Sequence, residues 1–484
     1  MLFNSYEYIL LFLPTVVLIY YALNRYGYTT GSKVWLVLAS WFFYSYWNPI
    51  YLPLLLGSIL VNYFIGTLLR TGQWEDKIRR WILVAGLAFN IGLLGYFKYA
   101  DFFISNLNAV LGSQFNLLHL LLPLGISFFT FQQIAYLVDT YRGEAREYSF
   151  VNYALFISFF PQLAAGPIVH HKEMMWQFED PDRKRWIPDN VARGLFLFVL
   201  GLAKKVLIAD TFGVWATYGF DTATSLTLIE GWITSLSYSL QLYFDFSAYS
   251  DMAIGAALLF NINLPINFFS PYKSTSIQEF WRRWHMTLSR FLRDYIYIPL
   301  GGNRISDFNT YRNLMITFLI GGLWHGAGWT FVFWGFLHGL ALVINRAWRK
   351  LGISLPNWLS WLITFNFVNA AWVFFRAETW ADAIKVLRAM AGLSGVALPV
   401  SLAQYLGDLS SRGVTFAAQM MNGNLLPAAL AVVVFMVVVL TVRNSIELKD
   451  SFRPGWASAA VVITLAVASI LSLTRVSEFL YFNF

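Results

Sequence analysis

Long apolar segments recur along this chain from one end to the other, and they limit its fold more than any other feature. They lie at residues 8–23, 34–49, 50–69, 82–99, 117–138, 191–209, 228–247, 314–344 (in one or two pieces), 356–375, 424–442 and 456–473. A helix of roughly 20 apolar residues crosses the hydrocarbon core of a bilayer, so this pattern predicts an all-α integral membrane protein with about eleven transmembrane helices.

The composition supports the same class. Hydrophobic residues make up 58% of the 484 positions and charged residues 12%, whereas a soluble domain has roughly half and a quarter. The formal net charge is +8, and the basic residues lie in short loops, where they set topology and attract anionic lipid. The basic loops near 25–33 and 70–80 are expected in the cytoplasm, with the amino terminus outside. We expect one polytopic membrane domain over residues 1–484 and no nucleic-acid binding.

The chain contains no cysteine, which excludes disulfides, thiolate metal sites and a catalytic thiol. No metal site is expected, because the adjacent His170 and His171 do not have the spacing of a zinc-binding motif. Two apolar stretches, 151–169 and 250–269, are interrupted by prolines and are expected to form re-entrant or half-inserted helices. Irregular backbone at membrane depth survives only where protein or a water-filled cavity covers it. The sequence therefore predicts a chamber within the membrane.

The segment 270–312 is unusual because it has seven lysines or arginines against three acidic residues. Residues 276–279 have the form of a capping box, which marks a helix start. The helical period that follows places His285 on an apolar face and the arginines on the other face, which indicates a helix at the membrane surface. These arginines either serve topology alone or bind a polyanionic donor such as a coenzyme A thioester. In the second case His285 lines the path from that entrance.

Residues 314–344 contain no charged residue, yet they include His325 and His338. An ionisable ring at membrane depth is costly and tends to persist where it faces a cavity or does chemistry. Glycines at 321, 322, 326 and 328 are expected to leave room for a substrate beside His325. The alternative is a structural histidine bonded to a backbone carbonyl. On a continuous helix His338 is turned away from His325 by about 220°, so it is expected to be a supporting residue.

Several further polar residues lie within apolar sequence: Gln132, Gln133, Asp139, Tyr243, Asp245, Ser247, Tyr249, Ser250 and Asp251. They either line the chamber or join helices by hydrogen bonds. Asp245 and Asp251 are the stronger candidates for a role in the site, because an unpaired carboxylate in a membrane is costly.

Residues 279–304 read EFWRRWHMTLSRFLRDYIYIPLGGNR, and this segment resembles a motif of the membrane-bound O-acyltransferases, in the bacterial branch that contains alginate O-acetyltransferase. The resemblance extends to residues 125–132, 160–167, 241–251, 324–326 and 373–376. It covers residues 1–376, whereas residues 377–484 are generic. One departure is Ala248, where the family pattern has glycine.

The resemblance implies a funnel-shaped fold with a through-membrane tunnel and an active site within residues 240–345. It implies that His325 is catalytic and that His285 occupies a second, more variable active-site position. Acetyl-CoA is the expected donor, and no bound cofactor is expected. The residues expected to bind substrate are Arg282, Arg283, Trp284, Arg293, Asp294, Asp245, Asp251, Trp324 and Gln132.

Related bacterial systems pass the acetyl group to an extracytoplasmic partner of the serine hydrolase-like type, which modifies a polysaccharide. The resemblance therefore implies an O-acetyltransferase subunit of the bacterial cytoplasmic (inner) membrane. Acyl transfer to a hydroxyl needs a base, and a neutral imidazole suits this role near pH 7. Because the chain has neither a cysteine nor a Gly-x-Ser-x-Gly elbow, direct transfer is favoured over a covalent enzyme intermediate. Two alternatives stay open: a transporter or flippase of a lipid-linked sugar or acyl carrier, and a lipid O-acyltransferase.

Overall fold

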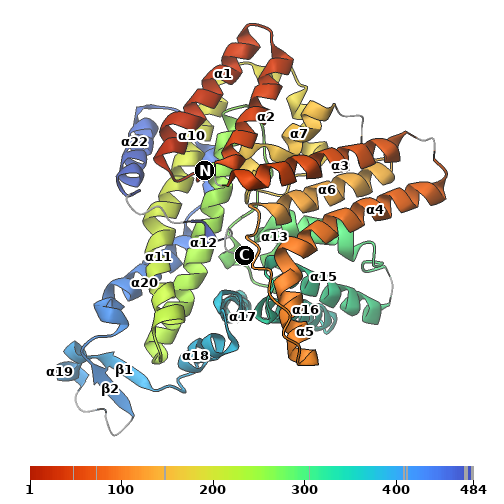
Figure 1. Cartoon of the computed structure of the whole chain (residues 1–484). Coiled ribbons are helices and arrows are strands. Elements are labelled where there is room, and N and C mark those ends of the chain that lie inside the picture. The colour runs from red at the N-terminus through yellow and green to blue at the C-terminus, as the bar shows by residue number, and fades with distance from the viewer. Residues whose placement is uncertain are drawn as a thin grey trace.

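The computed structural model describes residues 1–46, 48–71, 74–145, 149–304, 306–406, 409, 413–473 and 478–480. Most of these residues are helical (Figure 1). The first half of the chain forms α1 (Leu13–Arg25), α2 (Thr29–Ser45), α3 (Leu52–Arg70), α4 (Asp76–Leu94), α5 (Ala100–Leu111), α6 (Ile126–Tyr141), α7 (Phe150–Ser158), α8 (Phe160–Leu163), α9 (His171–Met174), α10 (Pro188–Ala203), α11 (Asp210–Thr217) and α12 (Leu228–Leu258). The second half forms α13 (Ile277–Arg283), α14 (Met286–Leu292), α15 (Asp307–His325), α16 (Trp329–Lys350), α17 (Asn357–Arg376), α18 (Trp380–Met390), α19 (Ala403–Leu406), α20 (Leu425–Thr441), α21 (Ser445–Ser451) and α22 (Trp456–Leu471).

The prediction of an all-α protein is wrong in the carboxyl-terminal region. Strands β1 (Val396–Pro399) and β2 (Val414–Ala417) pair in parallel, with Val396 opposite Val414. This unit projects from one end of the helical body (Figure 1). β-Branched and aromatic residues in β2 favour extended backbone, and Gly395 and Gly413 precede the two strands with positive φ values of 90° and 75°. A helix cannot continue through such positions.

Five helical stretches within the described residues are long and apolar enough to cross a membrane. They are Glu7–Arg25, Pro49–Arg70, Asp76–Leu111, Trp329–Lys350 and Asn357–Arg376. The bent pair α20 and α21 makes a sixth if it is counted as one span. The molecule is therefore a multi-pass membrane protein, while the count of about eleven spans and the through-membrane tunnel stay predictions.

Helix α12 is the central element of the helical body. It has 31 residues, most of them buried, and it packs against α10, α11, α17, α18 and α20. The expected division into a span at 228–247 and a half-inserted helix at 250–269 is wrong, because α12 continues without a break to Leu258. The helix ends there because Asn261 adopts a positive φ of 58° and Pro265 follows, which disfavours further helix.

Glycines allow α10 to lie close against α12. A Cβ atom on Gly255 would lie 2.6 Å from the carbonyl oxygen of Gly194, and one on Gly201 would lie 2.8 Å from that of Ala248. Small residues permit this approach of two helix backbones. Ala248, the departure from the family pattern, is fully buried at this contact, so its methyl group is accommodated.

Two irregular segments approach each other beside α6. The predicted break within 151–169 is confirmed, because α7 ends at Ser158, Phe159 leaves the helical conformation with ψ 111°, and the four-residue α8 follows. The predicted span 117–138 is helical only from Ile126, since Pro123 and the positive φ of Gly125 (69°) precede it. A Cβ on Gly125 would lie 2.5 Å from the carbonyl oxygen of Leu163. This position therefore requires glycine for both conformation and space.

Candidate active site

His325 is the last residue of α15, and three residues separate it from the start of α16. The predicted segment 314–344 therefore forms two helices. Gly326 has extended backbone with φ −159°, so the chain leaves the helix directly after the histidine. The His325 side chain is 3% exposed. It lies inside the protein at a helix end, where backbone carbonyls need partners from outside the helix.

Close packing of α15 against α16 fixes the position of His325 relative to α16. A Cβ on Gly322 would lie 2.4 Å from the carbonyl oxygen of Phe331, and one on Gly335 would lie 2.4 Å from that of Phe318. The ring of Phe331 fills the space beside Gly326, where a Cβ would meet it at 2.2 Å. Gly322 and Gly326 thus serve helix packing rather than the predicted space for a substrate.

Three aromatic rings from three helices surround the His325 ring. The centroids of Trp324, Trp334 and Phe375 lie 4.9, 5.1 and 5.1 Å from it. The indole N–H groups of Trp324 and Trp334 are buried and have no hydrogen-bond acceptor among the described residues. Buried donors of this kind are rare in folded proteins. They are available to an oxygen of a bound substrate.

His285 lies between two helices, so the predicted single amphipathic helix is wrong at its centre. The predicted helix start is confirmed, because Ser276 Oγ accepts a hydrogen bond from the backbone N–H of Glu279 at 3.1 Å. The helix then stops at Arg283, and His285 takes a left-handed conformation with φ 42° before α14 begins. Such a conformation is uncommon for a residue other than glycine and points to a constraint from elsewhere in the chain.

Asn267 supplies that constraint and orients the His285 ring. The backbone N–H of Met286 donates to the Asn267 carbonyl oxygen at 3.0 Å. The side-chain Oδ1 of Asn267 accepts from the Thr287 backbone N–H at 3.3 Å and from its hydroxyl at 3.0 Å, and lies 3.1 Å from His285 Nδ1. Because this oxygen can only accept, Nδ1 of the neutral ring carries the proton and Nε2 carries the lone pair. Sequence reasoning missed Asn267, since it lies in a loop without a recognisable motif.

The two candidate catalytic histidines meet in space. The ring centroids of His285 and His325 are 6.3 Å apart, and the ring of Trp324 lies 6.0 Å from the first and 4.9 Å from the second. Phe131 of α6 stacks on Trp324 at 5.2 Å. The neighbouring Gln132 is buried in the same helix. We call the two histidines with Trp324 and Trp334 the histidine site.

A cavity of about 590 Å³ opens close to the histidine site on the side of α13 and α14. Its wall includes Met286 and Thr287, the two residues that follow His285. One part of the wall is apolar and includes Trp281, Phe318 and Leu342, and another part carries Arg282, Arg290 and Arg293. We call it the basic cavity. Its mixture of arginines and apolar side chains suits a ligand with an anionic head and a less polar tail.

The arginines of the basic cavity differ in their freedom to bind a ligand. Arg290 is held by Glu173 through contacts of 2.5 and 2.8 Å. Arg293 pairs with Asp294 at 2.7 Å, so these two residues, both predicted to bind substrate, bind each other instead. Arg282 is exposed and makes no ion pair within the described residues. It is the arginine most available to an anionic ligand.

Two other predicted binding residues are structural. Arg283 lies 2.8 Å from Glu279 one turn earlier. Partial burial raises the pKa of the Glu279 carboxyl, but hydrogen bonds from Thr275 and the Arg283 guanidinium lower it by more, so its pKa lies below the ordinary value. Trp284 is buried, with its ring 4.9 Å from that of Trp372. Neither side chain faces the basic cavity.

Asp245 and Asp251 form buried ion pairs, which makes them structural in this arrangement. Lys205 Nζ lies 2.6 Å from Asp245 Oδ1, and Lys204 Nζ lies 2.8 Å from Asp251 Oδ2. The other oxygen of Asp245 accepts from the backbone N–H of Leu480 at 3.0 Å. These contacts join α12 to the π-helical turn Lys204–Ala209. The sequence could not reveal them, because the pairing depends on how α12 packs.

His338, for which a supporting role was predicted, is held inside the protein beside Trp281. Trp281 Nε1 donates to His338 Nδ1 at 3.2 Å, and the ring is fully buried. His338 belongs to α16 and His325 to α15. The expected difference in direction therefore arises from a break between helices rather than from rotation along one helix.

A second cavity of about 310 Å³ lies next to the chain that follows His325. Gly326, Ala327 and Phe331 line it together with Lys98 and Asp101. We call it the second cavity. Lys98 was missed from the sequence, although a charge inside the apolar run 82–99 was a signal for it. Within the described residues, no group of three or more histidine, aspartate or glutamate side chains is placed to hold a metal ion.

Comparison with known proteins identifies the family of this chain. Residues 140–377 match the model of the membrane-bound O-acyltransferase family. The chain is also 48% identical over 520 residues to a peptidoglycan O-acetyltransferase of Helicobacter pylori, an alignment that covers 100% of this chain and 98% of that protein. The chain belongs to the membrane-bound O-acyltransferase family. It is an acyltransferase, and both histidines lie within the matched residues.

Other relatives of this O-acyltransferase differ in acceptor and in acyl group. A probable alginate O-acetylase of Pseudomonas putida is 38% identical over 512 residues, which cover 100% of each chain. A teichoic acid D-alanyltransferase of Streptococcus thermophilus is 30% identical over 283 residues, which cover 52% of this chain and 68% of that protein. Resemblance over the full length is thus found with relatives named as O-acetylating enzymes.

Proposed function

We propose that this acyltransferase takes acetyl from cytoplasmic acetyl-CoA and passes it across the bacterial cytoplasmic (inner) membrane for O-acetylation of an extracytoplasmic polysaccharide. The observation that carries the proposal is the histidine site, where His285 and His325 lie 6.3 Å apart. The residues that follow His285 line the basic cavity, and the residues that follow His325 line the second cavity. The full-length relatives named for O-acetylation of peptidoglycan and alginate support acetyl as the acyl group.

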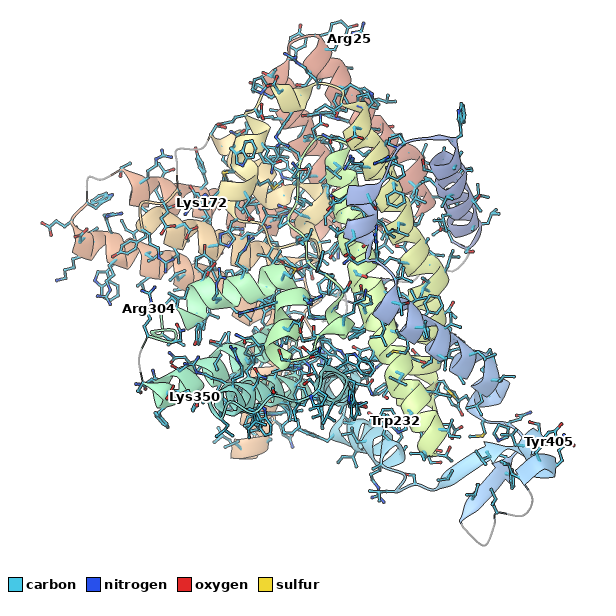
Figure 2. The ribbon with its side chains drawn as sticks, turned by 180° about the vertical axis from the view of Figure 1, so that it is seen from behind. Arg25, Lys172, Trp232, Arg304, Lys350 and Tyr405 are labelled. Carbon is cyan, nitrogen blue, oxygen red and sulfur yellow. The ribbon has the colours of Figure 1, made fainter. Side chains whose placement is uncertain are left out.

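The basic cavity is the proposed donor site. Its free arginine, Arg282, would bind phosphate groups of acetyl-CoA, and its apolar wall would hold the thioester arm. The positions of other basic residues support a cytoplasmic location for this side. Lys172, Arg304 and Lys350 lie on the same side of the molecule (Figure 2), and Arg304 follows the cavity-lining Tyr297 along the chain.

The second cavity is the proposed approach of the acceptor hydroxyl. His325 accepts the proton of this hydroxyl while its oxygen attacks the thioester carbonyl carbon. The carbon–sulfur bond then breaks, and the thiolate of coenzyme A receives the proton. The orphaned indole N–H groups of Trp324 and Trp334 would donate to the carbonyl oxygen as negative charge develops on it. Because Nδ1–H of His285 donates to Asn267, Nε2 can only accept a hydrogen bond, so His285 would hold the donor through an amide N–H of the coenzyme A arm next to the thioester.

The immediate acceptor is proposed to be a serine hydroxyl of an extracytoplasmic serine hydrolase-like partner, which then acetylates the polysaccharide. The transporter and lipid-acyltransferase hypotheses make different predictions about the products. A transporter would move its cargo without releasing coenzyme A. A lipid acyltransferase would place acetyl on membrane lipid rather than on polysaccharide.

The test uses the bacterium that carries this protein, because its own partner and polymer are then present. A strain lacking the protein is complemented with the wild type, with His325→Ala or with His119→Asn, a substitution of an exposed histidine by a residue that tolerates its positive φ of 49°. Alkali-labile acetyl is measured on the purified envelope polysaccharides and on the lipids. We expect acetylated polysaccharide with the wild type and His119→Asn only. Unchanged polysaccharide acetylation in the deletion strain, or acetyl found only on lipid, contradicts the proposal.

A further inference from the structure

The last turn of α15 ends in three successive carbonyl groups that receive hydrogen bonds from outside the helix. The Tyr99 hydroxyl donates to the Leu323 carbonyl oxygen at 2.7 Å. Lys98 Nζ donates to the carbonyl oxygens of Trp324 at 2.6 Å and of His325 at 3.1 Å. Carbonyls at the end of a helix have no partner within it. Two adjacent side chains thus complete the hydrogen bonding of the turn that carries His325.

All three hydrogen-bond donors of the Lys98 ammonium group have acceptors in this arrangement. Its third donor reaches Ser127 Oγ at 3.3 Å, and an ammonium group has three donors in all. Within the part of the chain that the structure describes, no carboxylate pairs with Lys98: nearby Asp101 accepts instead from the backbone N–H groups of Leu118 and His119. The ammonium is stabilised by the carbonyls and by the negative end of the α15 dipole. A half-buried lysine without a counter-ion inside an apolar segment is costly, so its presence needs a compensating role.

The backbone around Lys98 is also unusual. Lys98 and Tyr99 lie in a π-helical turn, Gly95–Tyr99, between α4 and α5. In a regular helix successive side chains point about 100° apart. The wider turn brings both side chains to the end of α15. Isolated π-helical turns within helices occur frequently at functional sites.

We propose that Lys98 and Tyr99 are positioning residues for His325. By binding the carbonyls of Leu323, Trp324 and His325, they prevent the final turn of α15 from unwinding or rotating. This fixes the direction of the His325 ring relative to His285 and to the second cavity, which Lys98 also lines. The inference rests on the proposed function, because it assumes that His325 acts on the acceptor hydroxyl.

The experiment measures acetyl transfer in membrane vesicles from the complemented deletion strain, with radiolabelled acetyl-CoA as the donor. The variants are Lys98→Met, which removes the charge and all three donors, and Tyr99→Phe, which removes one hydroxyl. Matched controls remove hydrogen bonds of the same kind, from a lysine or a tyrosine to backbone carbonyls, at the ends of other helices. Lys385 Nζ donates to the carbonyl oxygens of Phe220 and Ala223 at 2.8 Å each, and the Tyr21 hydroxyl donates to that of Leu259 at 2.8 Å. The control variants are therefore Lys385→Met and Tyr21→Phe.

We expect kcat to fall about 100-fold in Lys98→Met and roughly tenfold in Tyr99→Phe, with KM for acetyl-CoA unchanged, because a misplaced catalytic group loses rate rather than donor affinity. The controls should keep the wild-type kcat even where their thermal unfolding midpoint falls. If Lys98→Met does not accumulate in the membrane, Tyr99→Phe decides the question. Wild-type kcat in a folded Tyr99→Phe, or an equal fall in kcat in the two controls, overturns the positioning role. If the wild type itself transfers no acetyl, the proposed function fails instead.

Discussion

The rings of His285 and His325 lie 6.3 Å apart, although one residue ends a long helix and the other occupies a break between two short ones. Asn267 holds Nδ1 of His285 at 3.1 Å, while Lys98 binds the backbone carbonyl of His325. Each histidine is therefore placed by a polar residue from a different part of the chain. This division allows the two rings to have different tasks, one on the donor and one on the acceptor.

Replacing the base at this site should abolish transfer while the protein remains folded. In His325→Ala we expect polysaccharide acetylation to fall by a factor of about 1,000, within the range that general-base catalysis contributes. Membrane-vesicle assays with radiolabelled acetyl-CoA measure the rate, and immunoblotting measures the amount in the membrane. His119→Asn is the histidine control, because His119 is exposed and asparagine tolerates its positive φ of 49°. A His325→Ala protein that acetylates at the wild-type rate would exclude His325 as the base.

The role of His285 can be separated from its unusual backbone conformation. Asparagine tolerates a positive φ better than alanine does, so His285→Asn should fold where His285→Ala loses stability. We expect kcat of His285→Asn to fall roughly 100-fold. The comparison of kcat with the thermal unfolding midpoint in detergent distinguishes lost chemistry from lost structure. Full activity in a stable His285→Asn would show that the ring only fills space.

The ion pair of Lys205 and Asp245 should matter for stability and not for donor binding. Asp245→Asn removes the nearer of the two carboxylates that pair with the buried Lys205, and Asp210 remains at 3.0 Å. The substitution should therefore cost about 2 kcal/mol, the contribution of one hydrogen bond to a charged group. The double variant Lys205→Met with Asp245→Leu should recover most of that loss. Asp450→Asn is the control, since the Asp450 side chain is 62% exposed and ion pairs with an exposed member contribute little. Thermal unfolding measures stability. An altered KM for acetyl-CoA in a stable Asp245→Asn would mean that Asp245 contributes to donor binding after all.

Features that depend on neighbouring residues were predictable from the sequence. The capping bond at Ser276, the break within 151–169 and the break within 314–344 all follow from local composition, and each is present. His325 was chosen as a candidate because an ionisable ring is unusual in apolar sequence, and the structure places it beside His285. The assignment of His285 as a second active-site residue came from the resemblance to the family, because helical periodicity alone did not decide its role.

Features that depend on distant contacts were not predictable. The apolar period through 276–295 continues past His285, but Asn267 bends the chain there. Asp245 and Asp251 looked available because their lysine partners lie on another helix. The glycines near His325 looked like open space, whereas Phe331 fills it. In each case a side chain far along the sequence decides the local structure.

The arginines of the basic cavity lead to a prediction about donor affinity. Arg282 is exposed and makes no ion pair within the described ranges, so Arg282→Gln should raise KM for acetyl-CoA about tenfold and leave kcat unchanged. The effect should shrink at high ionic strength, since salt screens exposed charges. Arg80→Gln, an exposed arginine on α4, is the control. Equal KM values for wild type and Arg282→Gln at low salt would mean that the phosphates of acetyl-CoA do not bind to Arg282.

The packing of α15 on α16 gives the sharpest test of how precisely His325 must be placed. A methyl group on Gly322 would lie 2.4 Å from the carbonyl oxygen of Phe331, and a backbone atom cannot move aside as a flexible side chain can. Gly322→Ala must therefore separate the two helices, which costs about 1–3 kcal/mol and shifts the turn that ends in His325. We expect kcat to fall about 100-fold with KM for acetyl-CoA unchanged.

Gly92→Ala is the control for this prediction, because a Cβ at that position of α4 would meet nothing within 4 Å. It should keep the wild-type kcat. Both variants exchange glycine for a better helix former, so intrinsic helix propensity favours each of them equally. A difference between them therefore reports on the contact between α15 and α16. Wild-type kcat in Gly322→Ala would mean that the histidine site tolerates displacement of the helix that carries its base.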